Sequence, residues 1–250
     1  MTDSPAVPSP TPSAARFAGR RVVVTGAAGG VGRSLVELLR AEGARVVATD
    51  VVPGEGIVAT DLSDEQQIEG FVATALEELG GLDVLCNVAG VQRFTQVGSL
   101  TAAELRRHLD INAVGPLLLT QGFVDALAQA RGNVVSIASI SALMGQPYNA
   151  AYCASKAALL LGMRALAVEL AGRGIRVNCV SPGGIDTPMV EGAAHSLPSD
   201  VDWNLIAKSQ SVIPGFMPPA DVAQAVLFLA SDAASSITGA NLVVDRGVIW

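Results

Sequence analysis

The chain has 250 residues, of which 50% are hydrophobic, and its 16 Lys and Arg against 23 Asp and Glu give a formal net charge of −7 at pH 7. This length suits one large α/β domain or two small ones and is sufficient to bury a substantial core. Because the balance is acidic and no segment is rich in Lys or Arg, nucleic acid and anionic membranes are disfavoured as partners.

The first residues and the longest apolar helical segment give no sign of export or of a membrane anchor. Residues 1–15 are rich in Pro, Ser and Thr, without the basic start and apolar centre of a secretory signal, and we expect them to form a disordered tail. Residues 157–171 carry Arg164 and Glu169, whereas a membrane span needs roughly 20 mostly apolar residues.

The three cysteines, Cys86, Cys153 and Cys179, share no spacing typical of metal ligands. Reduced, buried and structural thiols are therefore expected, and no metal site is predicted. Without an export signal, we expect a cytoplasmic protein.

Short β-branched runs alternate with longer helical patterns after the tail. Strands are predicted at residues 21–25, 45–50, 56–60, 82–87, 133–138, 175–180 and 242–244. Helices are predicted at residues 31–42, 64–79, 101–130 with a bend at Pro116, 151–172 and 219–230. Such alternation predicts a doubly wound α/β fold of the Rossmann type, with a mostly parallel, seven-stranded sheet and helices on both faces.

Neither an internal repeat nor a shift in composition marks a domain boundary, so residues 16–250 are expected to form one domain. The one irregular stretch, residues 187–218, mixes Gly, Pro and Ser with scattered apolar residues. Long loops in compact domains are usually functional or disordered, and we interpret this one as a lid over a substrate.

A glycine-rich loop, Thr25-Gly-Ala-Ala-Gly-Gly-Val-Gly32, lies directly between the first strand and the first helix. Without Cβ atoms, its backbone N–H groups and the helix N-terminus can approach a pyrophosphate. Glycine-rich turns are common, but the order of strand, loop and helix favours a dinucleotide site. Its predicted contacts are Gly26, Gly30, Val31 and Gly32.

Asp50 ends the second predicted strand, where a carboxylate can accept hydrogen bonds from both ribose hydroxyls of an adenosine. The same charge would repel a 2′-phosphate, and residues 51–55 contain no Lys or Arg to bind one. The alternative is a solvated loop carboxylate. The pattern favours NAD over NADP as the cofactor.

Tyr152 and Lys156 are four positions apart and so share one face of a predicted helix. A phenol with a reference pKa of about 10 becomes a useful acid or base near neutrality only when its phenolate is stabilised. A nearby ammonium and a nicotinamide cation both do this. The pair alone is common, but here it follows a strand that ends in Ser136-Ile-Ala-Ser139.

From residue 20 to residue 247 the chain resembles the short-chain dehydrogenases/reductases of the single-domain type. The resemblance rests on motifs in family order: the loop Thr25–Gly32, Asp61-Leu62, Asn87-x-Ala89-Gly90, Asn112, Ser139, Tyr152, Lys156, Pro182-Gly183 with Thr187, Ile237-Thr-Gly239 and Val244-Asp245. It implies an enzyme that interconverts an alcohol and a carbonyl by hydride transfer, and relatives are commonly homotetramers. Residues 151–172 contain more apolar residues than one core-facing stripe of a helix needs, so we expect this helix to contribute to a subunit contact.

The resemblance also implies a role for each matched residue. Tyr152 would exchange the proton, Ser139 would bind the substrate oxygen, and Lys156 would hold the nicotinamide ribose and lower the pKa of Tyr152. Asn112 would anchor a water that relays protons through Lys156. The remaining cofactor contacts would be Asp61 and Leu62 at the adenine, Asn87, Ala89, Gly90, Pro182 and Gly183 along the loops, and Ile185 and Thr187 at the carboxamide.

Two positions depart from the family pattern. Val88 stands where a second Asn is usual, and we expect it to alter packing without abolishing cofactor binding. Arg246 stands where Gly is common, and its effect is left open. His108, beside Arg106 and Arg107, is expected on the polar surface of its helix.

The residues expected around the substrate are mostly apolar and favour a medium-sized or large hydrophobic alcohol or ketone, cyclic ones included. They are Arg93, Leu143, Met144, Tyr148, Met189, Trp203, Ile206, Phe216 and Met217. Two subfamilies compete: 3-oxoacyl carrier-protein reductases, which generally use NADPH, and cyclic dihydrodiol dehydrogenases, which residues 51–58 and 90–93 resemble. A nucleotide-sensing protein without catalysis is the third alternative, although such relatives usually lack part of the Ser, Tyr and Lys set.

Overall fold

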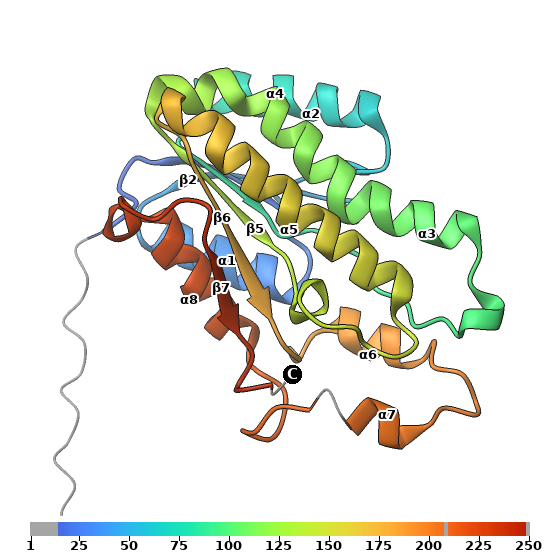
Figure 1. Ribbon diagram of the computed structural model, residues 1–250. Coiled ribbons are helices and arrows are strands. Elements are labelled where there is room, and N and C mark those ends of the chain that lie inside the picture. The colour runs from blue at the N-terminus through green and yellow to red at the C-terminus, as the bar shows by residue number, and fades with distance from the viewer. Residues whose placement is uncertain (1–14, 208–209, 249–250) are drawn as a thin grey trace, which may run out of the picture.

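The computed structural model describes residues 15–207 and 210–248, so almost all of the predicted tail lies outside the described residues. Seven parallel strands form one sheet in the order β3-β2-β1-β4-β5-β6-β7 (Figure 1). They are β1 (Arg21–Thr25), β2 (Arg45–Asp50), β3 (Ile57–Ala59), β4 (Val84–Asn87), β5 (Asn133–Ile137), β6 (Arg176–Pro182) and β7 (Asn241–Val244). The predicted fold class is confirmed.

Helices cover both faces of the sheet, as Figure 1 shows. One face carries α1 (Gly30–Ala41) and α8 (Pro219–Ala230), and the other carries α2 (Glu65–Leu79), α4 (Gly115–Ala130) and α5 (Ala150–Leu170). The shorter elements are α3 (Ala102–Leu109), α6 (Pro188–Ala194), α7 (Trp203–Ala207) and the 3-10 turns η1 (Val97–Ser99), η3 (Ile140–Ala142), η4 (Ala171–Arg173) and η5 (Asp232–Ala234). Outside residues 187–218, the predicted ends agree with these bounds to within two residues, the uncertainty usual for helix and strand ends.

The strands divide their side chains between two cores. In β1, Val22 and Val24 pack with α1 and α8, whereas Val23 between them packs with α2, α4 and α5. Successive strand residues point to opposite faces, so a strand covered on both sides buries side chains on both and is mostly apolar. This explains why the strands appear in the sequence as continuous apolar runs.

The predicted helix over residues 101–130 is present in three parts. A π-helical turn, η2 (Asp110–Val114), joins α3 to α4, and Pro116 lies in the first turn of α4. A π turn accommodates an extra residue and often occurs at functional sites. Here it buries the side chain of Asn112.

Two helical stretches, Ala102–Ala130 and Ala150–Arg173, are long and apolar enough by length and composition to cross a membrane. Both lie against the sheet, and the core contains Leu119 and Phe123 from the first stretch and Leu159 and Met163 from the second. The packing of the domain thus accounts for much of their apolar character.

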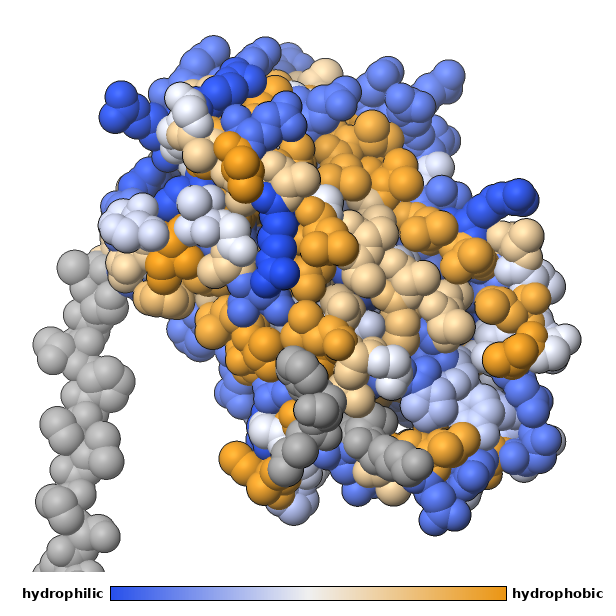
Figure 2. Space-filling view, in the orientation of Figure 1, coloured by the Kyte–Doolittle hydropathy of each residue, from blue (hydrophilic) through white to orange (hydrophobic). Residues whose placement is uncertain are grey.

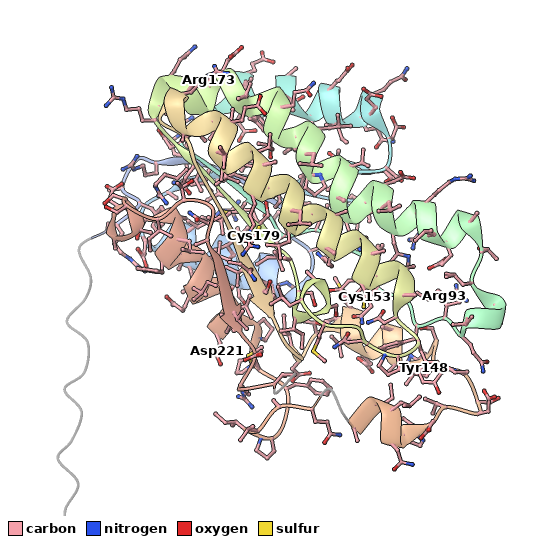
Figure 3. All side chains as sticks on the ribbon, viewed as in Figure 1. Arg93, Tyr148, Cys153, Arg173, Cys179 and Asp221 are labelled. Carbon is pink, nitrogen blue, oxygen red and sulfur yellow. The ribbon has the colours of Figure 1, made fainter. Side chains whose placement is uncertain are left out.

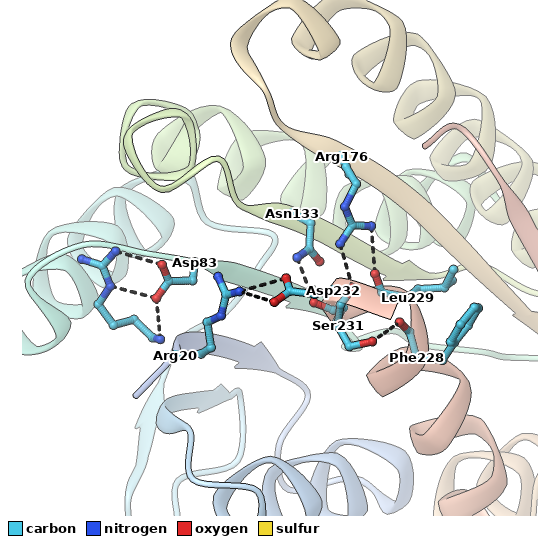
Figure 4. Close-up of polar contacts among 10 residues, drawn as sticks. Arg20, Asp83, Asn133, Arg176, Phe228, Leu229, Ser231 and Asp232 are labelled. Atoms are coloured by element: carbon cyan, nitrogen blue, oxygen red, sulfur yellow. Dashed lines mark hydrogen bonds and ion pairs between the residues drawn. The ribbon is translucent and has the colours of Figure 1, made fainter. Parts of the chain in front are cut away.

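Charged and polar side chains hold the amino edge of the sheet (Figure 4). Nε of Arg21 lies 2.9 Å from a carboxylate oxygen of Asp83, and Nη2 of Arg20 lies 2.9 Å from one of Asp232. Arg176 donates to carbonyl oxygens near the end of α8. Burial alone would raise the pKa of Asp83, but hydrogen bonds from Arg21 outweigh it and hold that pKa below its usual range. These contacts leave the opposite, carboxyl edge free for a site.

Candidate active site

A cavity of about 900 Å³ lies at the carboxyl edge of the sheet. Strand β1 lies between β2 and β4, so the chain leaves it in opposite directions, and such a switch point is where open α/β sheets bind ligands. The cavity is lined by these predicted cofactor residues: Gly26, Gly30, Val31, Gly32, Asp50, Asp61, Leu62, Ala89, Gly90, Pro182, Gly183, Ile185 and Thr187. Ser139, Tyr152 and Lys156 line the same cavity.

The glycine loop is held tightly against the loop that follows β4. Gly26 has a φ of +69°, and a Cβ there would lie 2.7 Å from Cα of Ala89. Thr25 Oγ1 accepts hydrogen bonds from the backbone N–H groups of Val88 at 3.0 Å and Ala89 at 3.1 Å. A side chain at Gly26 would break this contact, so the geometry fits a cradle for a pyrophosphate. Val88, the first departure from the family pattern, is buried in the core beside α1.

Asp50 ends β2 at the wall of the cavity. Its Oδ2 accepts a hydrogen bond from Ala28 N at 3.0 Å, and its Oδ1 accepts one from Val52 N at 3.0 Å. A carboxylate oxygen can accept more than one hydrogen bond, so capacity remains for ribose hydroxyls. Arg33, which donates to Ala28 O at 3.0 Å, also lines the cavity. Local sequence spacing does not identify this cation, because Arg33 lies in α1 and only the residues directly after Asp50 are its neighbours in the chain.

Tyr152 and Lys156 are buried side by side on α5. Lys156 Nζ donates to the carbonyl oxygen of Ile137 at 2.8 Å and lies 5.8 Å from the centroid of the Tyr152 ring. Burial raises the pKa of Tyr152 to about 12, while a hydrogen bond with Ser139 acts in the opposite direction. Burial lowers the pKa of Lys156 to about 8. Desolvation thus favours the neutral form of each group.

A chain of hydrogen bonds orients the hydroxyl of Ser139. Ser139 Oγ donates to Ser141 Oγ at 3.1 Å, and Ser141 Oγ donates to Gln146 Oε1 at 2.6 Å. Asn149 Nδ2 donates to the same Gln146 oxygen at 3.0 Å. Ser141 and Gln146 line the cavity. Neither was predicted, because they lie in a non-periodic loop whose conformation the sequence pattern does not specify.

Asn112 connects three parts of the site from behind the cavity wall. Its Nδ2 donates to Val91 O and to Ser155 Oγ, both at 2.9 Å, and its Oδ1 accepts from Val91 N at 2.8 Å. A Cβ on Gly90 would lie 3.0 Å from Asn112 Oδ1 and 3.3 Å from Lys156 Nζ. The structure therefore brings Gly90, Asn112 and Lys156 together. The water relay through Asn112 stays a prediction.

Asn87 also lies behind the lining, where its Nδ2 donates to Ser136 Oγ at 3.1 Å. This bond joins the neighbouring strands β4 and β5 at their carboxyl ends. The loop that follows Asn87 carries Ala89 and Gly90, which line the cavity.

The expected surface position of His108 is wrong. His108 is 0% exposed, its Nδ1 lies 2.9 Å from Glu104 O, and its ring meets that of Tyr152 edge to face with centroids 6.5 Å apart. Helix α3 packs on α5, which turns this position inward although its neighbours are arginines. One of them, Arg107, also lines the cavity. A contact between helices that are distant in sequence leaves no mark on the local charge pattern.

The expected substrate residues separate into two groups. Those that line the cavity are Met189, Trp203, Ile206 and Phe216, and those outside its lining are Arg93, Leu143, Met144, Tyr148 and Met217. Figure 3 shows Arg93 and Tyr148 at the end of the molecule where α6 and α7 lie. The Tyr148 hydroxyl accepts a hydrogen bond from Asp202 N at 3.0 Å, so this side chain supports the segment before α7. A direct role in substrate binding stays a prediction for every residue of both groups.

The predicted lid over residues 187–218 is more regular than expected. It contains α6 and α7, and residues 208–209 within it lie outside the described part of the chain. The Thr187 hydroxyl caps the start of α6 by accepting a hydrogen bond from Val190 N at 3.4 Å. The Thr187 side chain also packs against Gly30, where an added Cβ would lie 2.9 Å from Thr187 Cγ2. The short helices were missed because the Gly, Pro and Ser content of the segment masks their brief apolar spacing.

A family model described as enoyl-(acyl carrier protein) reductase matches residues 26–249. The cis-4-hydroxycyclohexanecarboxylate dehydrogenase of Sinomonas cyclohexanicum is 38% identical over 92% of this chain and 97% of its own length. The 3-oxoacyl-[acyl-carrier-protein] reductase of Thermotoga maritima is 34% identical, covering 94% and 99%. The 2,5-dichloro-2,5-cyclohexadiene-1,4-diol dehydrogenase of Sphingobium indicum is 33% identical, covering 92% and 97%.

Two solved structures share the fold over nearly the whole chain. A short-chain dehydrogenase from Mycobacterium paratuberculosis bound to NAD has a TM-score of 0.85 at 28% identity, covering 93% of this chain and 98% of that one. Another from Burkholderia cenocepacia in complex with NADP has a TM-score of 0.82 at 30% identity, covering 93% and 99%. With the glycine loop and the Ser139, Tyr152 and Lys156 set in one cavity, the chain belongs to the short-chain dehydrogenase/reductase family of oxidoreductases.

Proposed function

We propose that this protein is an NAD(H)-dependent oxidoreductase that interconverts a secondary alcohol and a ketone on a hydrophobic, cyclic substrate. One observation carries the proposal: Ser139, Tyr152 and Lys156 line the same cavity as the glycine loop and Asp50. A hydroxyl, a phenol and an ammonium are the groups that proton transfer to or from an alcohol oxygen needs.

Tyr152 exchanges the proton with the substrate oxygen, and Ser139 donates a hydrogen bond to that oxygen. The Ser139 hydroxyl turns from Ser141 Oγ to make this donation, while the hydrogen bond from Ser141 N at 3.1 Å holds Ser139 Oγ in place. NAD⁺, when bound, supplies the hydride acceptor and a positive ring that favours the phenolate. Lys156 contributes a second positive charge, and its bond to the Ile137 carbonyl oxygen keeps that charge near the phenol.

The preference for NAD rests on Asp50. Its carboxylate would oppose a 2′-phosphate and accept hydrogen bonds from ribose hydroxyls. Arg33 acts against this preference, because a guanidinium on the same cavity wall could pair with a phosphate. Solved relatives hold either NAD or NADP, and in this chain we attribute the choice to the balance between the charges of Asp50 and Arg33.

The residues on the lid side of the cavity support the proposed substrate class. Phe94, Met189, Leu197, Trp203 and Phe216 offer apolar surface there, while Ser141 and Gln146 offer neutral polar groups. Apolar walls with a few fixed polar groups suit a ring that carries oxygen substituents. Two relatives are named for cyclohexane or cyclohexadiene alcohols, which agrees with this class. Because one relative is named as a 3-oxoacyl-[acyl-carrier-protein] reductase, that activity is the second candidate for this protein.

We also propose a homotetramer. Helix α5 exposes Leu161 at 64% and Val168 at 81%, and Figure 2 shows apolar residues gathered on the face of the molecule that α5 crosses in Figure 1. The opposite side of α5 already packs on the sheet through Leu159 and Met163. A helix with apolar residues on both sides suits burial between two surfaces.

Tyr152→Phe is expected to lower kcat for oxidation of a cyclic secondary alcohol by at least about 100-fold, because the transferred proton loses its acceptor. Absorbance of the reduced nicotinamide, measured over a panel of cyclic and long-chain secondary alcohols, checks this. Dissociation constants for NAD⁺ and NADH should change little, since the glycine loop is intact. Unchanged turnover in the variant would refute the assignment, and a wild-type protein that binds NAD⁺ but oxidises no alcohol would support the nucleotide-sensing alternative.

Asp50→Asn is expected to reduce the ratio of kcat/KM for NAD⁺ to that for NADP⁺ by about 10- to 100-fold, because it removes the charge that opposes a 2′-phosphate. Arg33→Ala is the complementary variant and should raise the same ratio by removing the opposing cation. Steady-state kinetics with both cofactors and one alcohol provide the measurement. An Asp50→Asn ratio equal to that of the wild type contradicts this account.

Lys156→Met is expected to abolish turnover and yet raise the free energy of unfolding by about 1–2 kcal/mol at pH 7, because a buried ammonium is replaced by an apolar group of similar length. The folded pKa of about 8 lies below the ordinary value of 10.5. Between these pH values the unfolded chain binds more protons, so wild-type stability gains from rising pH. The advantage of the variant should therefore be largest below about pH 8 and shrink above it. Urea unfolding at pH 7 and pH 9.5 tests this, and an advantage that grows with pH would contradict it.

Leu161→Asp combined with Val168→Asp is expected to dissociate the tetramer, because a charge cannot be buried unpaired in an apolar contact. Light scattering should give about four times the chain mass of 25.5 kDa for the wild type and a smaller mass for the variant. Val97→Asp is the matched control, since Val97 is 86% exposed and lies in η1, outside α5. A wild-type mass of one chain at micromolar concentration rules the assembly out.

A further inference from the structure

Arg246 adopts a backbone conformation that is unfavourable for an arginine. Its φ is +57°, and among the described residues only Arg131 and Tyr148 are other non-glycine residues with positive φ. Left-handed backbone is strained for residues with a Cβ, and such strain persists where surrounding contacts require it. The resemblance to the family leads one to expect Gly here, which would adopt this φ freely. The contacts that hold the arginine in place therefore need an explanation.

The guanidinium of Arg246 binds the lid. Its Nη1 donates to the carbonyl oxygens of Pro214 at 3.1 Å and Gly215 at 3.4 Å. The backbone forms a second set of contacts with the same segment: Ile213 N donates to Arg246 O, and Val212 N donates to Gly247 O, both at 3.1 Å. Residues 212–215 are thus tied to the C-terminal segment through both the side chain and the backbone.

The next residue, Phe216, forms part of the cavity wall. Its ring lies on Gly184, where an added Cβ would come within 2.7 Å of Phe216 Cδ1. Phe216 is 60% exposed, so burial alone does not hold the ring in this position. On its other side, Met217 N donates to Gly184 O and Met217 O accepts from Asp186 N, both at 2.9 Å. Phe216 is therefore fixed from one side by Met217 and from the other by the segment that Arg246 holds.

We propose that Arg246 is a positioning residue for the substrate: its guanidinium holds residues 212–215 so that Phe216 closes one wall of the cavity. The inference rests on the proposed function insofar as that wall meets the alcohol. The hydrogen bond between Met217 N and Gly184 O does not involve Arg246. The position of Ile185 and the binding of the cofactor should therefore not depend on the Arg246 guanidinium.

Arg246→Gly and Arg246→Ala separate the effect of the guanidinium hydrogen bonds from the effect of the positive φ. Both variants lose the guanidinium, but only glycine relieves the positive φ. We expect hydrogen exchange of amides in residues 210–217 to rise about tenfold in both, the size of effect that loss of one charge-assisted hydrogen bond gives. The Tm should rise or stay level in Arg246→Gly and fall in Arg246→Ala. For a cyclic alcohol, KM should rise about tenfold in both variants, with kcat within about twofold and the dissociation constant for NADH unchanged.

Arg131→Gly is the matched control, because Arg131 also has a positive φ, 49°, but ends α4 far from the lid. It should raise Tm without changing lid exchange or KM. If hydrogen exchange in residues 210–217 stays at the wild-type level in both Arg246 variants, the guanidinium does not hold this segment. If exchange rises but KM is unchanged, Arg246 does not position the cavity wall for the substrate. The hydrogen-exchange measurement does not require catalysis. Failure of the alcohol screen would therefore count against the proposed function and not against the hold of Arg246 on residues 212–215.

Discussion

The hydrogen bond from the Lys156 ammonium to the carbonyl oxygen of Ile137 is the contact on which the candidate site depends. It joins α5 to the carboxyl end of β5 and places a positive charge within 5.8 Å of the centre of the Tyr152 ring. Burial opposes the charged form of both side chains, raising one pKa and lowering the other. The surrounding structure keeps the two groups together in a cavity that also suits a dinucleotide, and groups with such perturbed pKa values cluster at functional sites. A rearrangement that released Lys156 from Ile137 would take the positive charge away from a phenol whose pKa burial already raises.

Those parts of the molecule that follow from local rules were predictable from the sequence. Strands covered on both faces are rich in apolar, β-branched residues, so β1 and β5 were found almost to the residue. The spacing of Tyr152 and Lys156 placed them on one face of α5, since residues four apart are neighbours on a helix. The glycine loop was predictable because its glycines lie between a predicted strand and a predicted helix, and the structure shows why Gly26 is needed there, with a positive φ and no room for a side chain.

Features that arise from contacts between distant segments were not predictable in the same way. His108 is polar in type and has charged neighbours, yet the packing of α3 on α5 buries it against Tyr152. Gln146 directs Ser139 through Ser141, but the loop that brings these side chains together has no periodic pattern. Arg33 became relevant only when the fold placed it on the same cavity wall as Asp50. In each case the decisive distance is set by tertiary packing, and a single sequence does not encode it in spacing.

The π turn at Asp110–Val114 limits how the chain can vary in length. Removing one residue from it would restore a plain α-helix and rotate α3 by about 100° relative to α4. That rotation would carry His108 away from Tyr152 and detach Asn112 from Val91, although no side chain had been substituted. Single-residue deletions at this point are therefore incompatible with an assembled site, whereas the exposed η1 turn before α3 has room to gain or lose residues.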